Sequence, residues 1–126
     1  MKNPNDSFLR GRLRSLGFAL KGMWFLLTTE DSIKVQIFLT ILMIIAGFYF
    51  NLSAIEWMLQ LLAIGLVLVA ESLNTAVEKL ADFVHPDYHE KIGFIKDISA
   101  GAPSFAAIIS LVIVGIMYVP KILVMF

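Results

Sequence analysis

Cysteine is absent from this chain, which excludes disulfide bridges and thiolate metal sites. The patterns that identify many soluble ATP-dependent enzymes are missing too. There is no Gly-x-x-x-x-Gly-Lys phosphate loop and no soluble protein-kinase signature. No His-Glu-x-x-His metalloprotease motif occurs, and the two histidines, His85 and His89, stand in a predicted turn. Ten basic and ten acidic residues cancel, so the net charge says little about partners.

Apolar residues dominate the composition. They make up 59% of the 126 residues, against about 45–50% in ordinary soluble domains, and the mean hydropathy is +0.83. We therefore expect an integral membrane protein that forms one small all-α domain. That length leaves no room for a separate soluble catalytic domain. We also expect no cleaved signal peptide, because the charged N-terminal segment is not followed by a small-residue cleavage site.

The apolar pattern predicts four helical segments. The first, at about residues 6–27, mixes arginines with large apolar residues and reads as an amphipathic helix on a membrane surface. A helix packed on a soluble core is disfavoured, since no such core is expected. Three membrane spans follow at about 33–52, 55–84 and 96–120. The apolar run of the first span, Val35 to Phe50, is slightly short of the ~20 residues needed, and Ile33 and Leu52 can extend it. Pro86 is expected to end the second, and small residues such as Gly101 and Ala106 permit close packing of the third.

Lysine and arginine placement predicts the orientation in the membrane. The N-terminal segment is rich in basic residues, and so are the end of the second span and the connection to the third. The connection between the first two spans has none. We therefore expect the N-terminus and the 71–97 region on the cytoplasmic face, with Lys121 as a single exception. The basic residues in question are Lys2, Arg10, Arg12, Arg14, Lys21, Lys79, Lys91 and Lys96.

A polar stripe interrupts the second span. On a helix, Asn74, Glu78 and Asp82 fall within roughly 60° of Glu71. Ionisable groups at membrane depth are costly and usually mark function, so the stripe predicts cation binding, proton transfer or both. The alternative is a structural role, in which these polar side chains form hydrogen bonds between packed helices. Other acids are expected at the same membrane surface. They are Glu30 and Asp31, which could also simply favour a helix start by its dipole, and those between Asp87 and Asp97.

The stripe also resembles a known signature. Glu71-Ser-Leu-Asn-Thr-Ala-Val-Glu-Lys-Leu-Ala-Asp82 is similar to the motif of the small bacterial diacylglycerol kinase family, which includes undecaprenol kinases. That motif reads Glu, any, aliphatic, Asn, Ser/Thr, small, aliphatic, Glu, two of any, Val/Ile, Asp, and only Ala81 departs from it. Asp87-Tyr-His-Glu90 and Lys96-Asp-Ile-Ser-Ala-Gly-Ala102 resemble the family as well. Phe18 stands where some relatives have Tyr, and Pro103, where an aliphatic residue is usual, is expected to kink the third span.

The resemblance implies a trimeric helical bundle in the bacterial inner membrane. It implies an enzyme that moves the γ-phosphate of ATP onto a lipid hydroxyl, with active sites shared between protomers. Glu71 would be the general base, Glu30 and Glu78 would hold Mg²⁺, and Lys96 would contact the phosphates. The implied lipid-site residues are Glu71 and Ala100. The implied ATP-site residues are Arg10, Arg12, Phe18, Glu30, Asn74, Glu78, Asp82, Asp87, Tyr88, His89, Lys96 and Asp97. Which of the two arginines reaches nucleotide or lipid is left open.

The expected reaction is phosphorylation of diacylglycerol to phosphatidic acid. The first alternative is phosphorylation of undecaprenol, because both lipids present a primary hydroxyl at the interface. A small transporter or ion pathway is an alternative of another class. The acids weigh against it, since they gather at one surface and leave Gln60 as the polar residue of the outer half of the second span. An inactive scaffold is the last alternative.

Overall fold

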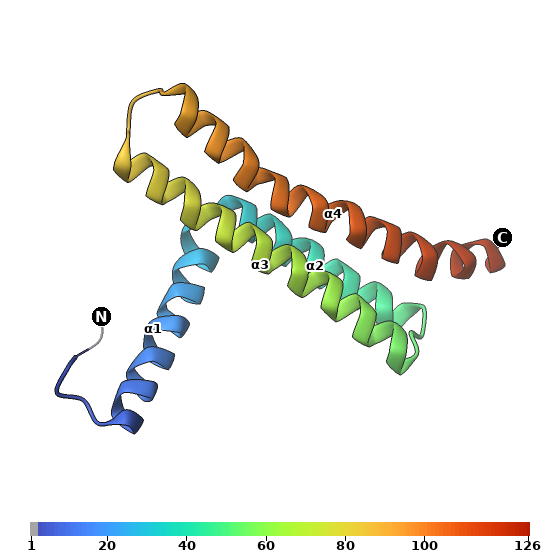
Figure 1. Ribbon diagram of the computed structural model, residues 1–126. Helices are drawn as coiled ribbons and strands as arrows, with labels where there is room; N and C mark the ends of the chain where they lie inside the picture. Colours follow the sequence, from blue (N-terminus) through green and yellow to red (C-terminus); the bar gives the residue numbers. More distant parts are fainter. Residues whose placement is uncertain (1–2) are drawn as a thin grey trace.

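The computed structural model describes residues 3–126, which form four α-helices (Figure 1). They are α1 (Phe8–Thr29), α2 (Asp31–Tyr49), α3 (Ala54–Val84) and α4 (Glu90–Val124). Helices α2, α3 and α4 are each long and apolar enough to cross a membrane. The fold is therefore that of an all-α membrane protein with three spans, as the sequence predicts. Lys2, one of the basic N-terminal residues, lies outside the described residues.

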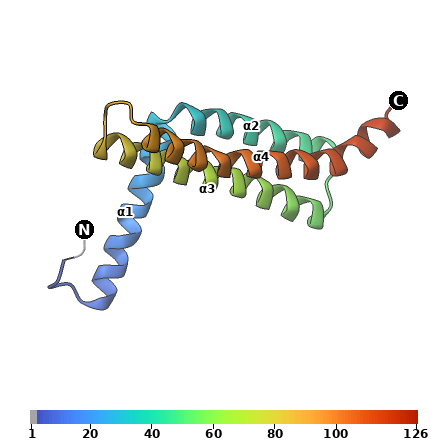
Figure 2. The same cartoon turned by 45° about the horizontal axis from the view of Figure 1, so that its top comes forward.

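Helix α1 stands apart from the bundle. It begins after Ser7, whose hydroxyl caps the helix by accepting a hydrogen bond from the Arg10 amide. It projects away from the other three helices (Figures 1 and 2) and contains no buried residue. Large apolar side chains, including those of Leu13 and Trp24, are exposed along it. A helix that combines exposed apolar groups with arginines suits a membrane surface.

The chain turns from α1 into α2 at a single residue. Glu30 has extended backbone angles, φ −99° and ψ 113°, so it interrupts the helical path between Thr29 and Asp31 and sets the direction in which α1 leaves the bundle. Its amide still bonds to the carbonyl of Leu26, and its carbonyl accepts from the amide of Lys34. Glu30 is thus a hinge position with both backbone groups satisfied.

A tight turn joins α2 to α3. Asn51 adopts a positive φ of 55°, a conformation that asparagine tolerates better than most residues. Ser53 and Glu56 then form a reciprocal capping box that starts α3. Close to this turn, Gly47 of α2 packs directly against the indole ring of Trp57, and a Cβ at Gly47 would lie 2.5 Å from the ring. The turn is therefore fixed both by capping and by close helix contact.

Helices α3 and α4 are longer than a membrane requires. The 31 residues of α3 span about 46 Å, and the hydrocarbon core is about 30 Å thick. The C-terminal part of α3, which carries the polar stripe, can therefore extend to the membrane surface. Helix α3 ends at Val84, two residues before Pro86. Helix α4 packs mainly along α3 (Figure 1) and continues through Pro103 and Pro120. The kink at Pro103 stays a prediction.

The opposite end of the bundle holds its own polar contacts. Lys121, the exception in the basic pattern, pairs with Glu56 at 3.2 Å. Deeper between the helices, Gln60 is 1% exposed and bonds to both α2 and α4. Most large apolar side chains of the three spans remain exposed on the single chain. Lipid or other copies of the chain must cover them in a membrane.

Candidate functional site

The four side chains of the polar stripe of α3 differ in solvent exposure. Asn74 is buried, Glu71 is half-buried, and Glu78 and Asp82 are exposed. The Asn74 amide nitrogen donates a hydrogen bond of 3.3 Å to the Glu78 carboxylate one turn away. The Asn74 side-chain oxygen is also buried but has no hydrogen-bond partner within residues 3–126. An unpaired buried acceptor costs stability, and this oxygen is closed off from solvent within the single chain.

Glu30 comes to the stripe from the hinge between α1 and α2. Its carboxylate lies 2.9 Å from the ammonium group of Lys79 on α3, and the Thr29 hydroxyl donates to the same carboxylate at 3.1 Å. The bond from Lys79 is the largest cause that holds the pKa of Glu30 below its usual value, and Thr29 adds to it. Glu30 is thus placed as an anion beside the turn of α3 that carries Glu78.

Lys96 reaches the stripe from the first turns of α4. Its ammonium group forms an ion pair with Asp82, which joins α4 to α3 across the connection between them. Asp97, the next residue, is exposed. Ala100, one turn further along α4, is exposed as well. Segments far apart in the sequence therefore place Glu30, Asp82 and Lys96 at the same end of the bundle.

The connection between α3 and α4 is short and open to its surroundings. His89 caps α4, its ring nitrogen accepting from the Lys91 amide at 3.1 Å. The His85 ring lies 5.1 Å from the His89 ring, and its Nδ1 is 2.7 Å from the carbonyl of Asp87. Tyr88 is 89% exposed. These side chains flank the stripe without closing it.

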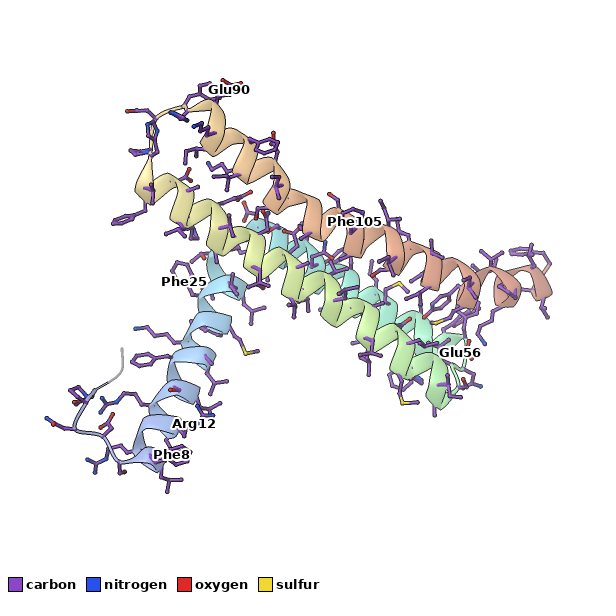
Figure 3. The ribbon with its side chains drawn as sticks, in the orientation of Figure 1. Phe8, Arg12, Phe25, Glu56, Glu90 and Phe105 are labelled. Atoms are coloured by element: carbon purple, nitrogen blue, oxygen red, sulfur yellow. The ribbon has the colours of Figure 1, made fainter. Side chains whose placement is uncertain are left out.

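The predicted nucleotide residues of α1 are not brought to the stripe within one chain. Arg12 lies at the far end of α1 from the bundle (Figure 3), and Arg10 is exposed one turn before Arg14. A pocket of about 400 Å³ lies at this far end, and Arg12, Arg14 and Phe18 contribute to its lining. Arg14 is held there by an ion pair of 2.8 Å with Asp6. Contact between these residues and the stripe requires another copy of the chain or a different position of α1.

The donors at the stripe are compatible with Mg²⁺. Within residues 3–126, no group of three or more His, Cys, Asp or Glu side chains is close enough to hold a metal. Mg²⁺ commonly takes only one or two carboxylates together with water and phosphate oxygens. Glu78 and Glu30 are hard oxygen donors of this kind. The chemistry of the donors fits the ion, and ATP phosphates would supply the rest.

Sequence reasoning missed one residue of this region. The sequence marks Lys79 only as part of the basic pattern, although it contacts Glu30 directly. The available signal was its position next to Glu78 on a helix. The pattern of α3 alone does not reveal that the α1–α2 hinge lies against that turn, so the pairing partner could not be named.

Comparison with known proteins agrees with the motif. The family described as prokaryotic diacylglycerol kinase matches residues 17–118. The chain is 34% identical over 108 residues to an undecaprenol kinase of Bacillus subtilis (strain 168), covering 86% of this chain and 88% of that protein. It is 32% identical over 112 residues to a diacylglycerol kinase of Synechocystis sp., covering 88% of this chain and 64% of the relative.

A third relative, a diacylglycerol kinase of Escherichia coli (strain K12), is 26% identical over 112 residues, which are 89% of this chain and 91% of that protein. The matched region contains α2, α3, nearly all of α4 and the whole polar stripe. The chain therefore belongs to the prokaryotic diacylglycerol kinase family, and it is a membrane-embedded lipid kinase that uses ATP.

Proposed function

We propose that this kinase phosphorylates diacylglycerol, giving phosphatidic acid. The observation that carries the phosphoryl-transfer part of the proposal is the arrangement at one end of the bundle, and the relatives named diacylglycerol kinase support the choice of lipid. At that end, Asp82 of the stripe pairs with Lys96 of α4, and Lys79, next to Glu78, pairs with Glu30 of the α1–α2 hinge. Phosphoryl transfer needs positioned acids and a cation near the phosphates. The resemblance of the stripe to the family motif also supports phosphoryl transfer at this end of the bundle.

The proposed chemistry assigns one role to each group. Glu71 takes the proton of the lipid hydroxyl, whose oxygen attacks the γ-phosphorus as the bond to ADP breaks. Lys96 offsets charge on the transferring phosphoryl group. Asn74 orients Glu78 through their hydrogen bond. When bound, Mg²⁺ would neutralise phosphate charge, with Glu30 and Glu78 as its protein ligands. Asp82 and Asp97 help to position Lys96 and the nucleotide. Asp87, Tyr88 and His89 would line the nucleotide site.

We further propose a homotrimer in the bacterial inner membrane, with the site on the cytoplasmic face. Basic residues concentrate at the end of the bundle that carries the stripe and along α1, which favours the cytoplasmic side. A site shared between protomers would place Arg10, Arg12 and Phe18 of one chain at the stripe of another. Ala100, exposed on α4 beyond Lys96, would face the lipid in that arrangement.

A second substrate has a specific observation in its favour. The relative that is 34% identical carries the name undecaprenol kinase, whereas the E. coli relative at 26% is a diacylglycerol kinase. Undecaprenol also presents a primary hydroxyl at the interface, so the same groups could act on it. The two substrates would differ in the apolar surface that holds the chains of the lipid.

A side-by-side assay decides between them. The full-length protein in lipid vesicles is supplied with Mg²⁺, radiolabelled ATP and either diacylglycerol or undecaprenol at equal mole fraction. Preferential labelling of diacylglycerol supports the proposal, and preferential labelling of undecaprenol replaces it with the second candidate. The Glu71→Gln variant is the matched control for background transfer. Ion flux in the same vesicles without ATP would instead favour a transporter.

A further inference from the structure

Lys79 is the point at which three parts of the chain meet. It projects from α3, one residue after Glu78. Its ammonium group lies 2.9 Å from the carboxylate of Glu30 at the hinge and 5.8 Å from the ring centroid of Phe25 on α1. Phe25 is at the end of α1 nearest the bundle (Figure 3). One lysine thus contacts both the hinge and the helix that the hinge orients.

These contacts matter because α1 has little else to hold it. It buries no residue. Its other hydrogen bonds and ion pairs within residues 3–126 are local, as in Arg14 with Asp6 and Thr28 with the carbonyl of Trp24. No other side-chain hydrogen bond or ion pair in this part of the chain links α1 or Glu30 to α3 or α4. Apart from the backbone of the Glu30 hinge, Lys79 therefore supplies the side-chain contacts that tie α1 to α3 within residues 3–126.

The same contact occupies a carboxylate that the proposed function assigns to Mg²⁺. An ammonium group and a divalent cation compete for carboxylate oxygens, since both are attracted by the same negative charge. The Lys79 side chain is 56% exposed and that of Glu30 is 20% exposed. An ion pair with one partner largely in water is weak. Lys79 can therefore be displaced without first dismantling the bundle.

We propose that Lys79 is a positioning residue that acts as a latch for α1. With no divalent cation bound, it holds Glu30 and Phe25, and so fixes the hinge. When a divalent cation with nucleotide takes Glu30, Lys79 leaves the carboxylate and the end of α1 becomes free to move. Metal binding is thereby coupled to the position of the surface helix. This inference rests on the proposed role of Glu30 as a metal ligand.

The first test measures metal affinity. Full-length protein in vesicles is titrated with Mn²⁺ in the presence of a non-hydrolysable ATP analogue, and free Mn²⁺ is read by electron paramagnetic resonance. Lys79→Met should tighten Mn²⁺ binding by about two- to fivefold, the range expected for loss of a weak competing ion pair. Lys34→Met is the matched control, because Lys34 pairs with the neighbouring Asp31 at 3.3 Å. If Lys34→Met tightens Mn²⁺ binding as much as Lys79→Met does, the effect comes from the loss of any nearby positive charge, and the latch proposal is overturned.

The double variant Glu30→Gln/Lys79→Met separates the latch from the function on which it rests. If Glu30 is a ligand, Glu30→Gln weakens Mn²⁺ binding, and adding Lys79→Met no longer tightens it. If Glu30→Gln leaves Mn²⁺ affinity unchanged, the metal assignment of Glu30 fails, whatever Lys79 does. If Glu30→Gln weakens binding while Lys79→Met alone has no effect, the latch fails and the metal assignment stands.

The second test follows α1 itself. Because the chain has no cysteine, a nitroxide can be placed on a single Met23→Cys substitution near the end of α1. Mg²⁺ with the ATP analogue should increase label mobility in the otherwise unchanged protein. Lys79→Met should give the mobile spectrum before any metal is added, and Lys34→Met should not. An immobile label in metal-free Lys79→Met would show that something other than this lysine holds α1.

Discussion

The hydroxyl of Tyr118 on α4 donates a hydrogen bond to the side-chain oxygen of Gln60 on α3. The Gln60 amide nitrogen in turn donates to the carbonyl of Met43 on α2, at 2.9 Å. A single chain of hydrogen bonds thus links all three spans, in the half of the bundle away from the polar stripe. Polar groups have few partners in hydrocarbon, so this network specifies how the three helices meet.

Removing the hydroxyl tests the network. Tyr118→Phe leaves the buried oxygen of Gln60 without its donor, and we expect it to lower the free energy of unfolding by about 1 kcal/mol, within the range measured for such bonds between membrane helices. The measurement is unfolding in mixed detergent micelles, followed by circular dichroism. Tyr49→Phe is the control, because Tyr49 is 69% exposed. The double variant Gln60→Leu/Tyr118→Phe should regain part of the loss, since paired removal leaves no orphan. A Tyr118→Phe protein as stable as the Tyr49→Phe protein would refute the role assigned to the Tyr118 hydroxyl.

Close packing at the α2–α3 turn gives a second test. A Cβ at Gly47 would meet Trp57 ring atoms at 2.5 and 2.8 Å, so Gly47→Ala must move the indole or the helix. We expect a destabilisation of about 1–3 kcal/mol, the usual cost of overpacking. Gly65→Ala on α3 is the control, because nothing lies within 4 Å of its added Cβ. Both are measured by the same micelle unfolding. A Gly47→Ala protein as stable as Gly65→Ala would mean that the indole has room to shift.

Local signals were enough to predict most of the helical layout. The apolar runs predicted three spans. Pro86 correctly predicted the end of the second span, because a proline restricts the backbone of the residue directly before it. The spacing of the stripe likewise put Glu71, Asn74 and Glu78 on one helix, where Asn74 contacts Glu78. These features depend on neighbours within a few residues, and that is the range over which helical periodicity carries information.

Contacts across the bundle could not be predicted in the same way. Lys79 and Glu30 are far apart in the sequence, and their pairing depends on how the α1–α2 hinge lies on α3. The bond between Tyr118 and Gln60 depends equally on the relative depth of two spans. Helix periodicity gives the face of each residue but not the register between helices, so neither contact follows from it. The roles of Arg10 and Arg12 stay predictions, because α1 points away from the stripe in the single chain (Figure 1).

Lys96 gives a test of phosphate contact. We expect Lys96→Met to lower kcat by about 10²–10³, as loss of one transition-state donor commonly does. Stability should change little, because the ion pair with Asp82 is partly exposed. ATP-dependent lipid phosphorylation measures the first effect and micelle unfolding the second. Lys91→Met, at an exposed lysine five residues earlier on α4, is the control. A stability loss that accounts for the lost activity would make Lys96 a structural tie to Asp82 and not a phosphate contact.

Glu71 gives the most direct test of the chemistry. It lies half-buried on α3, one turn before Asn74, and is proposed to take the proton of the lipid hydroxyl. Glu71→Gln keeps the shape and removes the base, so lipid phosphorylation should fall by about 10²–10⁴. Folding and binding of an ATP analogue should persist. Glu56→Gln is the matched control on the same helix, because Glu56 lies at the opposite end of the bundle (Figure 3), paired with Lys121 at 3.2 Å. Turnover retained in Glu71→Gln would exclude Glu71 as the base, and turnover lost equally in Glu56→Gln would point to a general effect on the bundle.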